Sequence, residues 1–98
     1  MISPKIPING GVLNAKALSL PAPRYPESAR SERVSGEVQV RIIIDENGNV
    51  AGAEAFSGPE LLRGAAVDAA RQAKFGPTRL QGEPVKVAGV LAYNFAIQ

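Results

Sequence analysis

The stretch "PRYPESARSERVSGEVQVRIIIDENGNV", from Pro23 to Val50, joins a short helix signal to an alternating strand and then to a tight turn. Between Val38 and Ile44 an apolar side chain recurs at every second residue. Such residues share one face of an extended strand, so the pattern predicts a strand over Glu37–Ile44 with one buried face. Asn47-Gly48 is the strongest short-range signal for a hairpin, which predicts a returning strand over Val50–Phe56.

Two helix signals flank this hairpin. Tyr25-Pro26-Glu27 predicts the start of a short helix, because proline suits the first helical position and an acidic side chain there meets the helix dipole. Ser35-Gly36 is expected to end this helix, with the glycine as a left-handed cap. Ser57-Gly58-Pro59-Glu60 predicts the start of a second helix, which should run to about Lys74.

Alanine makes up most of the apolar stripe of the second helix. The stripe consists of Leu62, Ala65, Ala66, Ala69 and Ala73. Because alanine is small, we expect this helix to lie close to the sheet, above the alanine-rich returning strand.

A final strand is predicted from Val85 to Ile97, longer than most strands, and part of its edge is expected to lack a partner within the chain. The order helix, strand, strand, helix, strand indicates an α+β domain in which two helices pack on a three-stranded antiparallel sheet. Residues 1–20, rich in Pro and Gly, are expected to form an extended lead before a domain of residues 21–98. Within the lead, Gly11 to Leu20 has the pattern of an extra short N-terminal strand or a small hairpin.

The composition excludes several kinds of function. The 98 residues carry a formal net charge of +2, and their basic side chains are spread along the chain, so no nucleic-acid binding is predicted. The sequence has no His and no Cys, which removes the commonest proton shuttle and any thiolate. Asp45 and the residues after it do not have the spacing of a calcium loop, and Ser57 lacks the glycines of a nucleophile elbow. We predict no enzyme activity, no catalytic residue, no metal site and no cofactor.

The chain also lacks the signals of a membrane or exported precursor. No apolar run approaches the ~20 residues of a membrane-spanning helix, and the N-terminus lacks the apolar region of a signal peptide. We expect any anchor or export signal to lie upstream of Met1. A cytoplasmic chain is the alternative that the sequence leaves open.

The order and spacing of these motifs resemble the TonB C-terminal domain family. In the first part the matching residues are Tyr25-Pro26, Ala29, Gly36, Val38, Val40, Ile42, Asp45, Gly48 and Val50. The stretch "SGPELLRGAAVDAARQAKFGP" is similar to the family's Ser-Gly start, alanine-containing helix and aromatic-x-Pro exit, and "GEPVKVAGVLAYNFAI" resembles its last strand, with Phe95 at the usual aromatic position. The resemblance covers about residues 21–98. It departs at Ala22-Pro23, where some members carry Gln-Pro at a place tied to receptor contact.

The resemblance implies a periplasmic domain of an energy transducer anchored in the inner membrane, where its missing upstream regions meet a proton-driven motor complex. Such a domain grips an extended segment of a TonB-dependent outer-membrane transporter by strand addition and transmits force to it. Free strand edges pair readily with extended chains, so the last strand is the expected binding edge. The predicted peptide-binding residues lie on this strand or near it: Pro23, Tyr25, Val85, Val87, Ala88, Gly89, Val90, Leu91, Ala92, Tyr93 and Asn94.

Two alternatives accompany this prediction. A non-catalytic envelope module that self-associates or binds cell-wall material fits the same pattern, because an edge that recruits a peptide can recruit its twin and give an exchanged homodimer. Tyr25 is also expected to pack the first helix onto the sheet, as a lone aromatic residue usually does. An upstream membrane helix and a Pro-rich spacer would favour the transducer.

Overall fold

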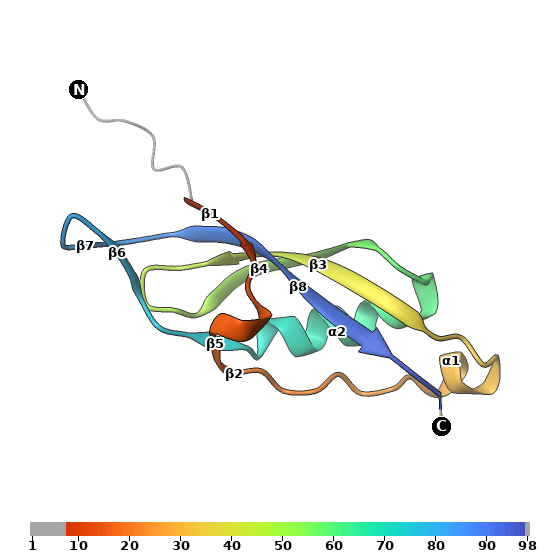
Figure 1. Cartoon of the computed structure of the whole chain (residues 1–98). Helices are drawn as coiled ribbons and strands as arrows, with labels where there is room; N and C mark the ends of the chain where they lie inside the picture. Colours follow the sequence, from red (N-terminus) through yellow and green to blue (C-terminus); the bar gives the residue numbers. More distant parts are fainter. Residues whose placement is uncertain (1–7, 98) are drawn as a thin grey trace.

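The computed structural model describes residues 8–97, which form a twisted sheet with the helices on one side (Figure 1). The main sheet contains β1 (Ile8–Val12), β8 (Val87–Phe95), β3 (Gly36–Ile44) and β4 (Val50–Ser57), in that spatial order. β3 pairs antiparallel with both β4 and β8, while β1 lies parallel to β8. The predicted α+β fold with three antiparallel strands is confirmed, and the lead adds a fourth strand that makes the sheet mixed.

The hairpin between β3 and β4 follows its sequence signal. The Asp45 carboxylate accepts the N–H groups of Asn47 and Asn49, both at 2.9 Å, and so closes the turn. Gly48 takes φ +90°, and the Phe75 N–H donates to its carbonyl at 2.9 Å. A side chain at Gly48 would put its Cβ 1.9 Å from the Phe75 carbonyl oxygen. The turn therefore needs glycine for its conformation and for the close approach of a second segment.

Helix α2 (Glu60–Arg71) packs on β4 and β3 with the predicted small-residue face. Leu62, Ala66 and Ala69 are buried as expected, and Ala70 is buried as well. The N-cap is Pro59 and no side chain caps the helix, so the expectation that Ser57 or Gly58 would cap it is wrong. It also ends before the predicted Lys74, because Lys74–Phe75 form the short strand β5, which pairs with β2 (Ala17–Ser19) of the lead.

Helix α1 (Glu27–Ser31) is shorter than predicted. Its last turn closes when Val34 donates its N–H to the Ala29 carbonyl at 2.8 Å, and Arg33 takes the left-handed conformation with φ +55°. This six-to-one bond around a left-handed residue is a common helix ending. The C-cap is Glu32, and the left-handed residue that follows it is Arg33 and not Gly36, whose φ is +139°.

The predicted last strand from Val85 to Ile97 is wrong at both ends. Its first residues belong to β7 (Glu83–Val85), which pairs with β6 (Thr78–Leu80) in a separate two-stranded ribbon. Positive φ angles at both Gln81 and Gly82 make this a tight turn suited to a two-residue hairpin. Lys86 separates the ribbon from β8, and β8 ends at Phe95.

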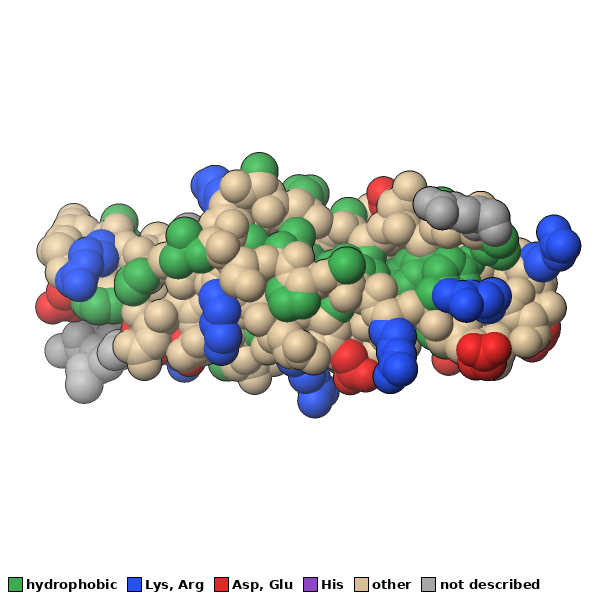
Figure 2. Space-filling model, turned by 90° about the horizontal axis from the view of Figure 1, so that it is seen from below, with side chains coloured by type: hydrophobic (Ala, Val, Ile, Leu, Met, Phe, Trp, Pro, Cys, Tyr) green, Lys and Arg blue, Asp and Glu red, His purple; other side chains and the backbone are tan. Residues whose placement is uncertain are grey.

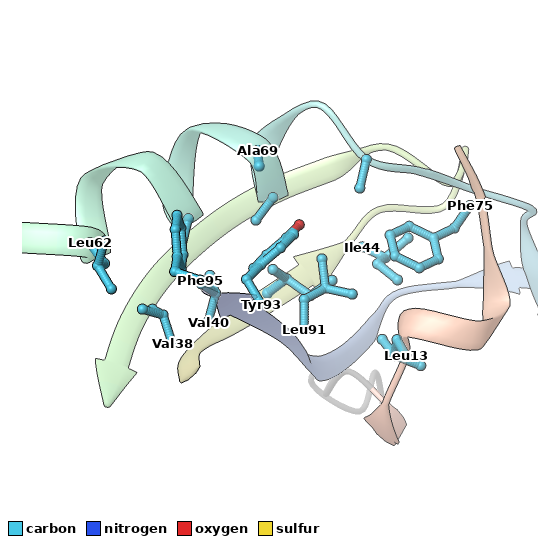
Figure 3. Close-up of a cluster of buried hydrophobic side chains, with 14 of the residues drawn as sticks. Leu13, Val38, Val40, Ile44, Leu62, Ala69, Phe75, Leu91, Tyr93 and Phe95 are labelled. Carbon is cyan, nitrogen blue, oxygen red and sulfur yellow. The ribbon is translucent and has the colours of Figure 1, made fainter. Parts of the chain in front are cut away.

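The hydrophobic core lies between the sheet and α2 (Figure 3). Val38, Val40, Leu91, Tyr93 and Phe95 enter it from the sheet, and Leu13, Ile44 and Phe75 form its other end. The molecule is elongated, with extents of 54 × 24 × 16 Å. Viewed from the side of the lead and α2, apolar side chains lie in separate groups, and Lys and Arg are spread along the length (Figure 2).

The lead continues after β1 through the 3-10 helix η1 (Asn14–Lys16), β2 and an extended stretch that reaches α1 (Figure 1). The small hairpin considered for Gly11 to Leu20 does not form, since β1 pairs with β8 and β2 with β5. Residues 1–7 of the predicted lead and Gln98 lie outside the described residues. Between residues 8 and 97, the helices are too short or too polar to cross a membrane.

Candidate functional site: the outer edge of the last strand

Strand β8 has one edge against β3 and a second edge that faces away from β3. The second edge is defined by the residues whose main-chain groups point there. Val90 and Ala92 bond to the lead through these groups, and alternation along a strand places the main-chain groups of Ala88 and Asn94 on the same side. We call these four main-chain positions the outer edge of β8.

The first half of the outer edge is paired with β1. The paired residues are Ile8 with Val87, Asn9 with Ala88, and Val12 with Val90. The pairing is irregular between Asn9 and Val12, where Gly11 takes φ +68° and its N–H donates to the Asn9 side chain at 3.0 Å. β1 therefore occupies an edge that the sequence predicted to be free.

The side chain of Asn14 continues this pairing where β1 ends. Its amide nitrogen donates to the Ala92 carbonyl at 2.8 Å, and its amide oxygen accepts the Ala92 N–H at 2.9 Å. Just before it, the Leu13 N–H donates to the Val90 carbonyl at 2.9 Å. One side-chain amide thus supplies the donor and the acceptor that the main chain of a neighbouring strand would supply.

Leu13 passes over Gly89 to reach the core. Its side chain is 3% exposed, and it lines a pocket together with Ile44, Phe75 and Val87. A Cβ at Gly89 would lie 2.3 Å from Leu13 Cδ1 and 2.8 Å from the Gly11 carbonyl oxygen. Glycine therefore leaves a gap in β8 through which the Leu13 side chain enters, and we call this gap the Gly89 notch.

Eight of the predicted peptide-binding residues lie on β8, and they divide into two sets. Val87, Gly89, Leu91 and Tyr93 are buried on the side of the helices; Ala88, Val90, Ala92 and Asn94 lie on the opposite face, partly or fully exposed. The prediction of an unpaired edge is wrong from Val87 to Ala92, because the lead supplies β1 and the Asn14 amide. Asn94 is the first residue of the outer edge beyond that amide.

The other three predicted residues lie away from this edge. Val85 belongs to the ribbon of β6 and β7. Pro23 borders a groove of about 460 Å³ between the lead and α2. The Tyr25 ring meets Phe95 edge to face at 5.6 Å, and its hydroxyl donates to the Val34 carbonyl, so it packs α1 against the end of β8.

The residues that cover the edge were not among those predicted from the sequence. Gly10, Leu13 and Asn14 lie before the stretch that carries the family resemblance. Gly10 is close-packed, since a Cβ there would lie 2.9 Å from Leu13 Cδ2 and from Val87 Cγ1. The local signal is the glycine pair followed by apolar residues and an amide, a pattern that indicates a strand or hairpin but not its partner.

The chemistry of this edge is that of main-chain amides and apolar side chains. The hydroxyl of Tyr93, on the core side of β8, is buried without a hydrogen-bond partner, and burial raises the pKa of Tyr93 to about 12. In the part of the chain that the structure describes, no three acidic side chains gather to hold a metal ion. The arrangement can hold an extended polypeptide.

Strand β4 forms the opposite edge of the sheet. Among the described residues no strand pairs with its outer side. Its outward face carries Glu54, which approaches Arg41 to 3.7 Å, and Phe56, whose ring lies 4.8 Å below the Arg41 guanidinium. This edge is the second place where an extended chain can add to the sheet.

The chain is similar to proteins of one family. The family model described as the Gram-negative bacterial TonB protein C-terminal matches residues 21–97. Protein TonB of Vibrio cholerae is 40% identical over 65 residues, which cover 64% of this chain and 27% of that protein. Protein TonB of Xanthomonas campestris is 32% identical over 90 residues, which cover 90% of this chain and 40% of that protein. The chain thus spans less than half the length of these curated relatives.

A solved structure shares the fold. The solution NMR structure of the Pseudomonas aeruginosa TonB CTD matches with a TM-score of 0.70, covering 90% of this chain and 94% of that chain. The two sequences are 22% identical over this match. The likeness therefore concerns the arrangement of helices and strands.

Proposed function

The chain belongs to the TonB C-terminal domain family, a family without enzymatic activity, and from this premise we propose that it is the transporter-binding domain of an energy transducer. Membership confirms the resemblance read from the sequence and the prediction of a non-catalytic domain. In the proposal the domain works in the periplasm. It binds an extended segment of a TonB-dependent outer-membrane transporter by strand addition and transmits force to it.

The pairing already present along the outer edge of β8 is the observation that supports strand addition. This edge holds extended chain through main-chain bonds from Val87 to Val90 and through the Asn14 amide at Ala92. Strand addition uses the same bonds and gains selectivity from pockets for alternate side chains. The Gly89 notch is such a pocket. The proposed binding residues are therefore those of β8, from Val87 to Asn94.

Force transmission follows from the direction of the bonds. A segment that lies along β8 and is pulled along its length loads several main-chain hydrogen bonds together. The elongated molecule allows the load to enter at one end and leave at the other. In the proposal, upstream regions of the complete protein connect this domain to an inner-membrane anchor and a proton-driven motor complex.

A peptide titration tests the proposal. A synthetic peptide copied from the periplasm-facing N-terminal segment of a TonB-dependent transporter is added to the isotope-labelled chain, and backbone amide shifts are followed. We expect the largest changes in β8 and in the lead residues that now cover it. The control is a peptide of the same length in which proline replaces alternate residues, because proline cannot donate the main-chain bonds.

Two outcomes would contradict the proposal. Shifts confined to α2 would mean that the peptide does not join the sheet. Equal binding of the proline-containing control would mean that main-chain bonds do not hold the peptide.

The outer edge of β4 supports a second candidate function, an envelope module that self-associates or binds cell-wall material. Two copies joined along β4 would form one continuous sheet without disturbing β1. Sedimentation over a wide range of concentrations checks this, and Ala53→Pro in the middle of β4 should abolish any dimer. A chain that stays monomeric at millimolar concentration argues against self-association.

A further inference from the structure

We infer that Ile8–Asn14 is an internal occupant of the outer edge of β8, and that the segment which replaces it carries a large aliphatic side chain for the Gly89 notch. The inference rests on the proposed function, because it assumes that this edge receives an extended partner. It adds what the partner must displace and which side chain it must bring.

The way in which the lead is attached to β8 favours its replacement by an incoming strand. β1 is the last strand on its side of the sheet, and Asn9, Gly11 and Val12 are exposed, Val12 by 67%. Among the side chains described from Asn9 to Asn14, only that of Leu13 is buried. The main-chain bonds of β1 are bonds that an incoming strand would make again. Exchange therefore alters few contacts apart from those of Leu13 and Asn14.

The Gly89 notch sets a requirement for the incoming segment. When Leu13 leaves, the apolar surface that it covers, formed by Ile44, Phe75 and Val87, is exposed to water. An aliphatic side chain of similar size restores this burial, whereas a small or charged one leaves the surface uncovered. The notch is therefore expected to select leucine or a residue like it at one position of the partner.

The place where Asn14 ends the pairing of the lead explains how a longer partner can displace the lead from β8. Main-chain pairing of the lead stops at Leu13, because the chain turns away into η1 and only the Asn14 side chain reaches Ala92. A segment that stays extended can pair with Ala92 through its own main chain and continue to Asn94. It thus uses more of the outer edge than the lead does.

A resident strand also lowers the apparent affinity for any partner. Binding is weakened by the fraction of molecules whose edge is open, and the lead competes at the high effective concentration of a tethered segment. Substitutions that weaken the attachment of the lead without altering β8 should therefore strengthen the binding of a partner segment.

The first test uses the lead itself as the probe. A synthetic peptide with the sequence of residues 8–15 is titrated against the full chain and against the full chain carrying Leu13→Ala and Asn14→Ala. We expect the altered chain to bind at least about tenfold more tightly. The same peptide with alanine in place of its leucine should bind the altered chain about tenfold less tightly or worse. Equal affinity for both chains, equal affinity of both peptides, or no binding to the altered chain overturns the inference.

The second test locks the lead in place and does not depend on the folding of the first variant. Asn9 and Ala88 are paired, and paired residues of neighbouring strands lie about 4.8 Å apart, a distance that a disulfide spans. The chain has no native cysteine, so Asn9→Cys with Ala88→Cys creates a single reversible bridge. We expect the transporter peptide to bind the reduced form and to lose at least about tenfold in affinity for the oxidised form.

The two tests separate this inference from the proposed function. If the transporter peptide binds the oxidised and reduced forms equally, transporter binding stands and the inference fails. If it binds neither form while the lead peptide binds the altered chain through its leucine, the inference about the edge stands and the proposed function fails.

Discussion

The two tyrosines of this chain place the same hydroxyl group in opposite environments. The Tyr25 hydroxyl donates to the Val34 carbonyl, whereas the Tyr93 hydroxyl is buried without a partner. A buried polar group without a hydrogen bond lowers stability, and a satisfied one adds to it. Removing the two hydroxyls should therefore change the free energy of unfolding in opposite directions.

We expect Tyr93→Phe to raise the free energy of unfolding by up to about 1–2 kcal/mol, because it removes an unsatisfied group and keeps the ring. Tyr25→Phe should lower the free energy of unfolding by about 0.5–1.5 kcal/mol, because the Val34 carbonyl loses its donor. Urea denaturation of both variants measures the difference. A loss of stability in Tyr93→Phe as large as that in Tyr25→Phe would show that the Tyr93 hydroxyl is satisfied.

The stability of the chain should also fall at alkaline pH through Tyr93. Burial raises the pKa of this hydroxyl from its usual 10.0 to about 12 in the folded state. The folded chain therefore keeps the proton after the unfolded chain has lost it, and unfolding becomes easier as pH rises. This contribution is fully present below pH 10.0 and is lost as the pH rises towards about 12.

Urea denaturation between these two pH values checks the prediction, with Tyr93→Phe as the control. The control should lose less stability over this range than the unaltered chain. Parallel losses in the two proteins would mean that other groups account for the whole effect.

At the scale of elements, two glycines show how context decides the effect of one substitution. Gly48 lies in the turn between β3 and β4 at φ +90°, and a Cβ there would meet the Phe75 carbonyl oxygen at 1.9 Å. Gly64 lies within α2, exposed, and a Cβ there would meet nothing within 4 Å.

Gly48→Ala should lower the free energy of unfolding by about 2 kcal/mol or more, since it strains the backbone and pushes Phe75 away from the turn. Gly64→Ala should raise it by about 0.5–1 kcal/mol, because alanine favours the helix. Thermal unfolding of the two variants gives the comparison. If Gly48→Ala is tolerated as well as Gly64→Ala, the close packing of Phe75 against the turn is wrong.

At the scale of the whole molecule, stability should be uneven across the sheet. The strands β4, β3 and β8 share the core with α2, whereas Leu13 is the one fully buried residue among those described from Asn9 to Asn14. Segments with few buried contacts open locally, at a lower free energy than global unfolding. The lead is therefore expected to leave the sheet while the rest of the domain stays folded.

Native-state hydrogen exchange tests this prediction. The amides of Leu13 and Ala92, which join the lead to β8, should exchange at a lower free energy than the amides of Val38 and Ile42 in β3. Leu13→Ala should speed the first pair and leave the second pair nearly unchanged. Exchange of all four amides at one free energy would mean that the lead is a permanent part of the core.

The sequence by itself determined the antiparallel part of the sheet and the helix that covers it. The alternation in β3, the Asn47-Gly48 turn and the alanine face of α2 are local patterns, and each was confirmed where it was predicted. Such patterns can be read because strand and helix periods depend on near neighbours in the chain. They also carried the family resemblance.

Only the tertiary structure decided what lies against the outer edge of β8. Asn14 and Ala92 are 78 residues apart, and nothing local to either residue indicates that one will bond to the other. Gly89 leaves a notch only because Leu13 passes over it. The break at Lys86 likewise follows from the pairing of β7 with β6. A pairing edge satisfies whichever extended segment reaches it, so the occupant is chosen by the course of the whole chain and not by the sequence of the strand.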